Sequence, residues 1–168
     1  WSDLFSKLGG SLDAADIHAA TSTDNDILFQ TTEIPNAVAS RGGVSKLVSI
    51  NYTNKQALAL NIDLIIMEVK TDWNDGTLGN TLAVSDDAVV SSKVLGIFQW
   101  DKAAVTLSSG EINQYAAIGD SAGTSDQLPI ILKASDGSTS VYFTAIDRDG
   151  GDTFTAKDLT FTFGIEYL

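Results

Sequence analysis

An acidic loop near the C-terminal end has the residue types of a calcium-binding loop. It contains Asp147, Asp149 and Asp152 with glycines between them. Alternate carboxylates can wrap around a hard cation, and glycine permits the tight turn. The match is imperfect, because a helical calcium loop has a third oxygen ligand where Gly151 stands. Two interpretations stay open: a weak calcium site formed by the three aspartates, or a solvated hairpin loop whose charge Arg148 partly offsets.

A tryptophan in a polar segment is a second candidate. Trp73 lies within residues 71–79, which are mostly polar, and an exposed indole ring can stack on a sugar ring. Tryptophans in loops are also commonly half-buried, with an ordinary structural role. A glycan contact at Trp73 is therefore one of two interpretations.

The residue combinations that common enzyme mechanisms require are missing from this sequence. His18 is the single histidine, and the chain has no cysteine, whereas a catalytic triad or a zinc site needs several groups that orient one another. No serine lies in a Gly-x-Ser-x-Gly turn. The segment 41–43, Arg-Gly-Gly, lacks the lysine of a phosphate-binding loop, and we expect it to turn the backbone into a strand at Val44. We predict a protein that is not an enzyme and has no cofactor, apart from calcium at the acidic loop.

Charge and length narrow the classes of partner. The 168 residues include 22 acidic and 10 basic side chains, for a net charge of −12, which argues against binding the phosphate backbone of nucleic acid. No apolar run approaches the roughly 18 residues of a membrane span. The length favours one domain, and the hydrophobic share of 43% can fill a core.

The first 26 residues differ in pattern from the rest. Trp1, Leu4, Phe5 and Leu8 recur at helical spacing. A helix of eight residues is too short to be stable alone, so this apolar stripe packs either on its own domain or on a partner chain. We expect an N-terminal arm over residues 1–26, followed by one domain over residues 27–168.

From residue 27 onward apolar and polar residues alternate, which is typical of half-buried strands. Strands are expected over residues 48–52, 58–64, 94–100, 112–118, 128–134, 139–146 and 158–168. The alternation changes phase near residues 65–66, which indicates a bulge. Asp136-Gly137 predicts a tight hairpin between two strands. Ser85, Asp86 and Asp87 predict the start of one short helix, which ends near Lys93.

About eight short strands in a chain of this length predict two stacked antiparallel sheets. We expect an all-β fold, an antiparallel β-sandwich that is jelly-roll-like, with one short helix and the N-terminal arm. An immunoglobulin-like sandwich is less suitable, because the cysteine pair is absent and residues 71–93 and 119–126 are long enough for crossovers between sheets. The expected core consists of Val48, Ile50, Leu60, Ile62, Leu64, Phe98, Ile130, Leu132, Val141, Phe143, Phe161, Phe163 and Ile165.

Several short motifs are spread over the chain from residue 27 to its C-terminus. They are Glu33-Ile34-Pro35-Asn36-Ala37 before Arg41-Gly42-Gly43, the strand Leu58–Leu64, Ser85-Asp86-Asp87-Ala88 before Val94-Leu95-Gly96, Ala134–Tyr142 and Thr153–Leu159. In these motifs the chain resembles a family of small structural proteins of tailed bacteriophages, many of them marine.

The resemblance implies a virion structural component, of the capsid decoration (cement) type, on the outer surface of the phage head. Such a protein contacts the major capsid protein and its own copies, and symmetry axes of a shell suit closed oligomers such as a trimer. Trp1, Leu4, Phe5 and Leu8 are then candidates for contact with the capsid or a neighbouring subunit. The alternative is a tail or head-fibre module that binds glycans through Trp73.

Overall fold

The computed structural model describes the backbone of residues 5–11, 22, 24–54, 61–73, 86–100, 105–108, 111–116, 128–148, 150–151 and 159–168, and the side chains of these residues except 5–11, 52–54, 86–88, 100, 105–108 and 111–116. In these ranges the elements follow the order β1 (Phe5–Ser11), β2 (Asp26–Ile27), β3 (Thr32–Ile34), β4 (Val44–Asn54), β5 (Ile62–Met67), α1 (Asp86–Ser92), β6 (Val94–Trp100), β7 (Val105–Ser108), β8 (Glu111–Ala116), β9 (Ile130–Lys133), β10 (Val141–Asp147) and β11 (Leu159–Tyr167).

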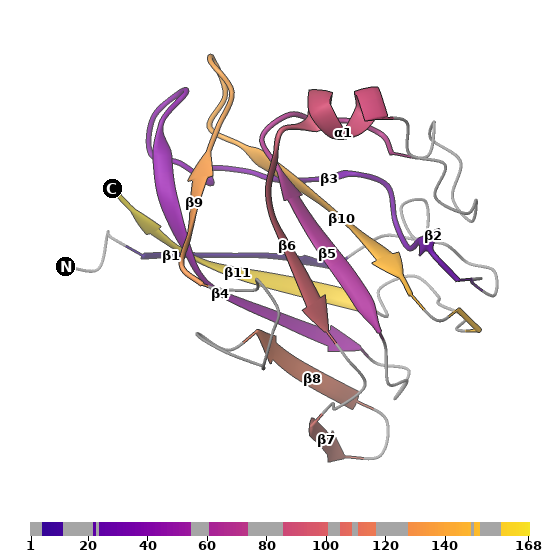
Figure 1. Ribbon diagram of the computed structural model, residues 1–168. Helices are drawn as coiled ribbons and strands as arrows, with labels where there is room; N and C mark the ends of the chain where they lie inside the picture. The colour runs from indigo at the N-terminus through magenta and orange to yellow at the C-terminus, as the bar shows by residue number, and fades with distance from the viewer. Residues whose placement is uncertain are drawn as a thin grey trace.

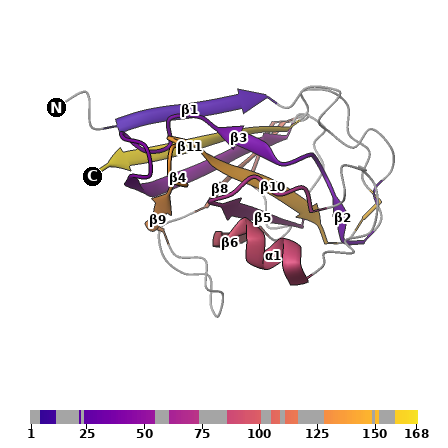
Figure 2. The ribbon, with the colours of Figure 1, turned by 90° about the horizontal axis from the view of Figure 1, so that it is seen from above.

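The strands form two sheets (Figure 1). One sheet has the order β1-β11-β4-β8-β7, with β9 paired to the N-terminal half of β4; the other has the order β2-β10-β5-β6, with β3 also paired to β10. Every pair of described strands is antiparallel. Seen from above, β1, β11 and β4 lie on one side of the molecule, and β5, β6 and α1 lie on the other (Figure 2). The prediction of an all-β chain with antiparallel sheets and one short helix is confirmed.

Along β11, apolar and polar residues alternate in the sequence, and buried and half-buried side chains alternate in the structure. Its odd-numbered residues from Leu159 to Ile165 are buried, and the residues between them are half-buried, because successive side chains of a strand point to opposite faces. The strand lies between β1 and β4. One apolar face of β11 therefore supplies the centre of the core.

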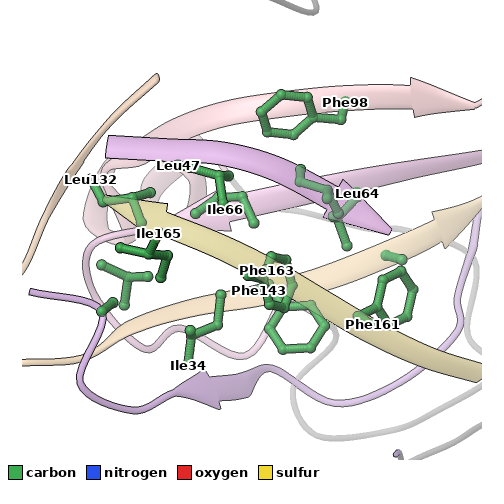
Figure 3. Close-up of a cluster of buried hydrophobic side chains, with 14 of the residues drawn as sticks. Ile34, Leu47, Leu64, Ile66, Phe98, Leu132, Phe143, Phe161, Phe163 and Ile165 are labelled. Atoms are coloured by element: carbon green, nitrogen blue, oxygen red, sulfur yellow. The ribbon is translucent and has the colours of Figure 1, made fainter. Parts of the chain in front are cut away.

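Four phenylalanines form that centre, as Figure 3 shows for three of them. The rings of Phe143 and Phe163 are 4.9 Å apart, those of Phe143 and Phe161 are 5.5 Å apart, and Phe29 is 5.3 Å from Phe143. Phe143 belongs to one sheet and Phe161 and Phe163 to the other. Each fully buried ring contributes about 1.5–3 kcal/mol of transfer free energy, so this cluster fastens the two sheets together.

A smaller apolar cluster lies on the other face of the five-stranded sheet. It comprises Ile27, Ile65, Met67, Trp73 and Ile146. β5 and β10 are consequently buried on both faces, which explains why alternation fails at Ile65. The register shift in the pairing with β6 lies between Ile66 and Met67, but the extra residue is Leu95 of β6, so the bulge expected at residues 65–66 is not in β5.

Most of the expected core residues are buried. Those confirmed are Ile50, Ile62, Leu64, Phe98, Leu132, Val141, Phe143, Phe161, Phe163 and Ile165. Ile130 is only partly buried and packs against the core, and Leu60 lies outside the described residues.

Val48 is not a core residue. The pairing of β11 with β4 shifts between Gly164 and Ile165, which leaves Val48 as the extra residue of a bulge. The bulge reverses the phase of β4, so Leu47 and Ile50 are both fully buried while Val48 is half-buried. The prediction that Val48 is buried was wrong because it assumed that buried and exposed residues alternate along the whole strand. The bulge interrupts this alternation.

Two local predictions are also wrong. Residues 5–11 form strand β1 rather than a helix, paired with β11 from Phe5 opposite Glu166 to Ser11 opposite Thr160. Asp136-Gly137 does form a turn, with Gly137 at φ +86°, but the strands on either side belong to different sheets: β9 pairs with β4, and β10 pairs with β5. The turn is a crossover between sheets and not a hairpin.

Candidate functional site

The acidic loop begins at Asp147, the last residue of β10, which is fully buried. Its carboxylate accepts hydrogen bonds from the hydroxyl of Ser22 at 2.5 Å and from the amide of Gly150 at 3.2 Å. Its backbone carbonyl accepts the amide of Asn25 at 2.7 Å, and Ser22 in turn accepts the amide of Gly151 at 2.8 Å. Asp147 therefore ties the turn after β10 to the segment that precedes β2.

The calcium prediction rests on three aspartates, of which only Asp147 lies in the described part of the chain. Asp149 and Asp152 fall outside it. Asp26 lies opposite Asp147 in the register of β2 and β10 and is also buried. Within the described ranges, no group of three or more histidine, aspartate or glutamate residues is placed to hold a metal ion. Calcium binding stays a prediction, and the observed hydrogen bonds give Asp147 a structural role in any case.

Arg148 has a different partner from the one expected. Its Nε lies 2.7 Å from Oδ1 of Asp63 on β5, and its amide donates to the carbonyl of Asn61 at 2.8 Å. The side chains of Arg148 and Asp63 are 28% and 19% exposed. Arg148 thus neutralises an aspartate of the neighbouring strand and fastens the loop to the end of β5.

Trp73 lies in the smaller apolar cluster and is 7% exposed. Met67, Ile65 and Ile146 belong to the same cluster. A sugar ring stacks only on an indole face that solvent can reach, so this burial favours the structural interpretation of Trp73 over the glycan contact. A polar segment can contribute one anchor to a cluster that distant strands form.

A second charged cluster joins three elements at the opposite end of β5. Nζ of Lys93 lies 3.0 Å from Oε1 of Glu68, which is 6% exposed as a residue. The hydroxyl of Ser135 lies 3.3 Å from the Glu68 carbonyl and 3.4 Å from Oε1. The amides of Glu68 and Val69 donate to the carbonyls of Lys93 and Ser92. These contacts hold the C-terminal end of α1 against β5.

The Arg-Gly-Gly segment has the structural role expected for it. Gly42 has φ +66°, and a Cβ on Gly43 would lie 2.7 Å from the carbonyl oxygen of Ser40. β4 begins at Val44, directly after this turn. Both glycines are therefore needed for the backbone to enter the strand.

Exposed apolar side chains lie on strands of both sheets. Val44 is 42% and Ile131 is 52% exposed, on the paired strands β4 and β9, and Ile97 on β6 is 45% exposed. An open groove of about 280 Å³ runs along β6 and reaches Ile130. Sequence patterns found the strand at residues 94–100, but nothing in them indicated that this strand would lie at the edge of a sheet.

No family model and no curated protein matches the chain. None of the described helices is long and apolar enough to cross a membrane.

His18, Trp1 and Leu4 lie outside the described residues, whereas Phe5 and Leu8 lie in β1, opposite Glu166 and Phe163. Positions three apart share a face of a helix but not of a strand, so these two residues do not form the stripe that helical spacing predicted.

Proposed function

We propose that this chain is a non-enzymatic structural protein of a tailed-bacteriophage virion, which decorates the outer surface of the head through contacts with the major capsid protein and with its own copies. The proposal begins with the resemblance of the sequence motifs to phage structural proteins. The nested order of the strands is the observation that supports it most.

The strand order supports a jelly-roll β-sandwich. β2 and β3 both pair with β10 and count as one interrupted strand, while β7 and β9 are additions to the sheet. The remaining strands pair in a nested way: β1 with β11, β2 and β3 with β10, β4 with β8, and β5 with β6. A long hairpin rolled over on itself has this nesting. Jelly rolls occur in viral capsid domains and in lectins, so the order is compatible with both candidate functions, and side chains must separate them.

The side chains favour a structural body over a glycan-binding module. Trp73 is buried in an apolar cluster, which argues against the residue on which the glycan alternative depends. Several buried polar groups tie elements together, as Asp147 ties residue 22 to β10 and Glu68 ties α1 to β5. A decoration protein requires this kind of rigid frame and apolar surfaces for packing on its neighbours.

The arm over residues 1–26 enters the proposal as a contact element. Trp1, Leu4, Phe5 and Leu8 stay the proposed contacts with the capsid or a neighbouring copy, as parts of a segment that includes strand β1 and not as one helical stripe. A three-fold grouping at a symmetry axis stays a prediction. The net charge of −12 would keep many outward-facing copies apart from other acidic surfaces.

Rebinding to capsids tests the proposal. Heads stripped of this protein, or assembled without it, are mixed with the purified chain and sedimented, and bound chain is quantified against the major capsid protein. We expect saturable binding that raises the temperature at which the heads release their genome, and weaker binding after deletion of residues 1–4, which keeps strand β1 (Phe5–Ser11) in place. Absence of binding to heads, together with binding to a glycan array, would replace decoration by the glycan alternative.

A further inference from the structure

The outer face of the six-stranded sheet has exposed apolar side chains where β4 begins. Val44 on β4 and Ile131 on β9 are 42% and 52% exposed. In the register of these strands Val44 lies opposite Lys133, and Lys46 lies opposite Ile131. Opposite and diagonal neighbours in an antiparallel pair share one face and are close enough for long side chains to touch. Two apolar and two basic side chains therefore alternate on this surface.

The neighbouring strand β11 extends the same surface. Glu166 lies opposite Lys46, and its carboxylate is 3.8 Å from the lysine Nζ. Leu168 directly follows β11, whose last residue pairs with the neighbour of Val44 on β4, and it is 61% exposed. These positions are more basic than the chain as a whole, which has a net charge of −12. The sheet patch is defined as Val44, Lys46, Ile131, Lys133, Glu166 and Leu168.

Helix α1 has a second exposed apolar surface, on an acidic segment. Val89 and Val90 are 41% and 76% exposed. The helix begins with Asp86 and Asp87 in the sequence. Lys93, which follows the helix, is paired with a buried glutamate, so its charge is already balanced. The segment Asp86–Val90, defined as the helix patch, is therefore apolar and acidic in composition.

The sheet patch and the helix patch are complementary, but they cannot meet within one chain. β4 and β11 lie on one side of the molecule, and α1 lies on the other (Figure 2). A second copy brings apolar side chains and the opposite charge to each patch, which is the complementarity that selects partners at interfaces. Contact between different surfaces of identical chains is head-to-tail, and it closes into a ring when the rotation between copies allows.

We infer that the sheet patch of one copy binds the helix patch of the next copy. Lys46 and Lys133 then face the two aspartates at the start of α1, and the exposed valines of the helix pack on the apolar side chains of the sheet. Two copies that repel one another through their net charge associate here because opposite charges meet. The inference rests on the contact between copies in the proposed function and specifies its two surfaces.

Mass in solution tests the contact with one variant on each patch. Ile131→Glu places a carboxylate opposite the acidic helix, and Val90→Lys places a positive charge opposite the two lysines. We expect light scattering after size exclusion to show an oligomer for the natural chain and a monomer for each variant, all with the same circular dichroism spectrum. Ile97→Glu is the matched control, because Ile97 is a strand isoleucine outside both patches and is 45% exposed. It should keep the natural mass.

Mixing the two variants distinguishes a head-to-tail contact from one in which a single patch binds itself. The Val90→Lys copy keeps its sheet patch, and the Ile131→Glu copy keeps its helix patch. An equal mixture should therefore contain species with both copies, although each variant alone is monomeric. Native mass spectrometry identifies these species, because the two variants differ in mass.

Four results would each overturn the inference. They are a natural chain that is monomeric at every concentration, a variant on either patch that keeps the natural mass, a mixture that stays monomeric, and loss of the oligomer in the Ile97→Glu control. None of these measurements uses phage heads. The contact between copies and the decoration proposal can therefore fail separately.

Discussion

The Nζ atom of Lys93 lies 3.0 Å from Oε1 of Glu68, and the two side chains are 58% and 7% exposed. A largely exposed lysine is thus paired with a carboxylate that is almost fully buried. A buried carboxylate that loses its partner retains the cost of its desolvation. The pair, together with the two backbone hydrogen bonds beside it, anchors the junction between α1 and β6 to the end of β5.

Removing the lysine is expected to destabilise the protein measurably. Lys93→Ala should lower the free energy of unfolding by about 1–2 kcal/mol, a value reduced because the lysine is more than half exposed. Lys133→Ala, at an exposed lysine on β9, should change it by less than about 0.5 kcal/mol. Urea unfolding followed by circular dichroism compares the two, and equal stabilities would show that the ion pair has no energetic role.

Gly43 and Gly137 are required for different physical reasons. Substitution by asparagine distinguishes these reasons. A Cβ at Gly43 meets the backbone of Ser40, whereas Gly137 has φ +86° and open space around it. Alanine should cost about 1–3 kcal/mol at either position. Asparagine tolerates the left-handed region, so Gly137→Asn should recover most of that loss and Gly43→Asn should recover none, as judged by thermal unfolding. Recovery at both positions would contradict the steric explanation for Gly43.

Trp73 is predicted to act through packing. Trp73→Ala should lower the free energy of unfolding by about 3–5 kcal/mol, as large buried side chains do. A glycan array should give no specific binding for the natural chain. If the array shows binding and Trp73→Ala abolishes it without a loss of stability, the buried position of the indole ring is wrong and the glycan alternative returns.

Asp147 is expected to stabilise the loop whether or not calcium is present. Asp147→Asn weakens the hydrogen bonds from Ser22 and Gly150 and should cost about 1–3 kcal/mol, while Asp72→Asn, at an exposed position, should cost little. Both variants and the natural chain are melted with millimolar calcium and with a chelator. A calcium-dependent rise in Tm that only Asp147→Asn lacks would support the metal site; equal Tm values in calcium and chelator would remove it.

The elements predicted well are those whose pattern is local. Period-two alternation over residues 159–167 and the acidic start of α1 at Asp86 each depend on neighbouring residues, so their structure follows from the sequence. β2 has two residues and β3 has three, which is too short for a period to be recognised. Their strand character comes from pairing with β10.

The errors come from relationships between distant segments. Val48 is displaced by a bulge that is visible only in the register against Gly164 and Ile165. Trp73 is buried by Ile27 and Ile146, which are far from it in the sequence. The same limitation applies to β6: residues 94–100 were predicted as a strand, but the place of this strand at the end of the order β2-β10-β5-β6 depends on all the other strands.

The copy number of this chain in the virion is the most direct test of the proposal that many copies cover a phage head. Quantitative mass spectrometry of purified virions would give the ratio of this chain to the major capsid protein. Decoration predicts a ratio near a simple fraction of the capsid protein's own copy number. A ratio hundreds of times lower would place the protein at the tail, neck or fibres and would contradict the account.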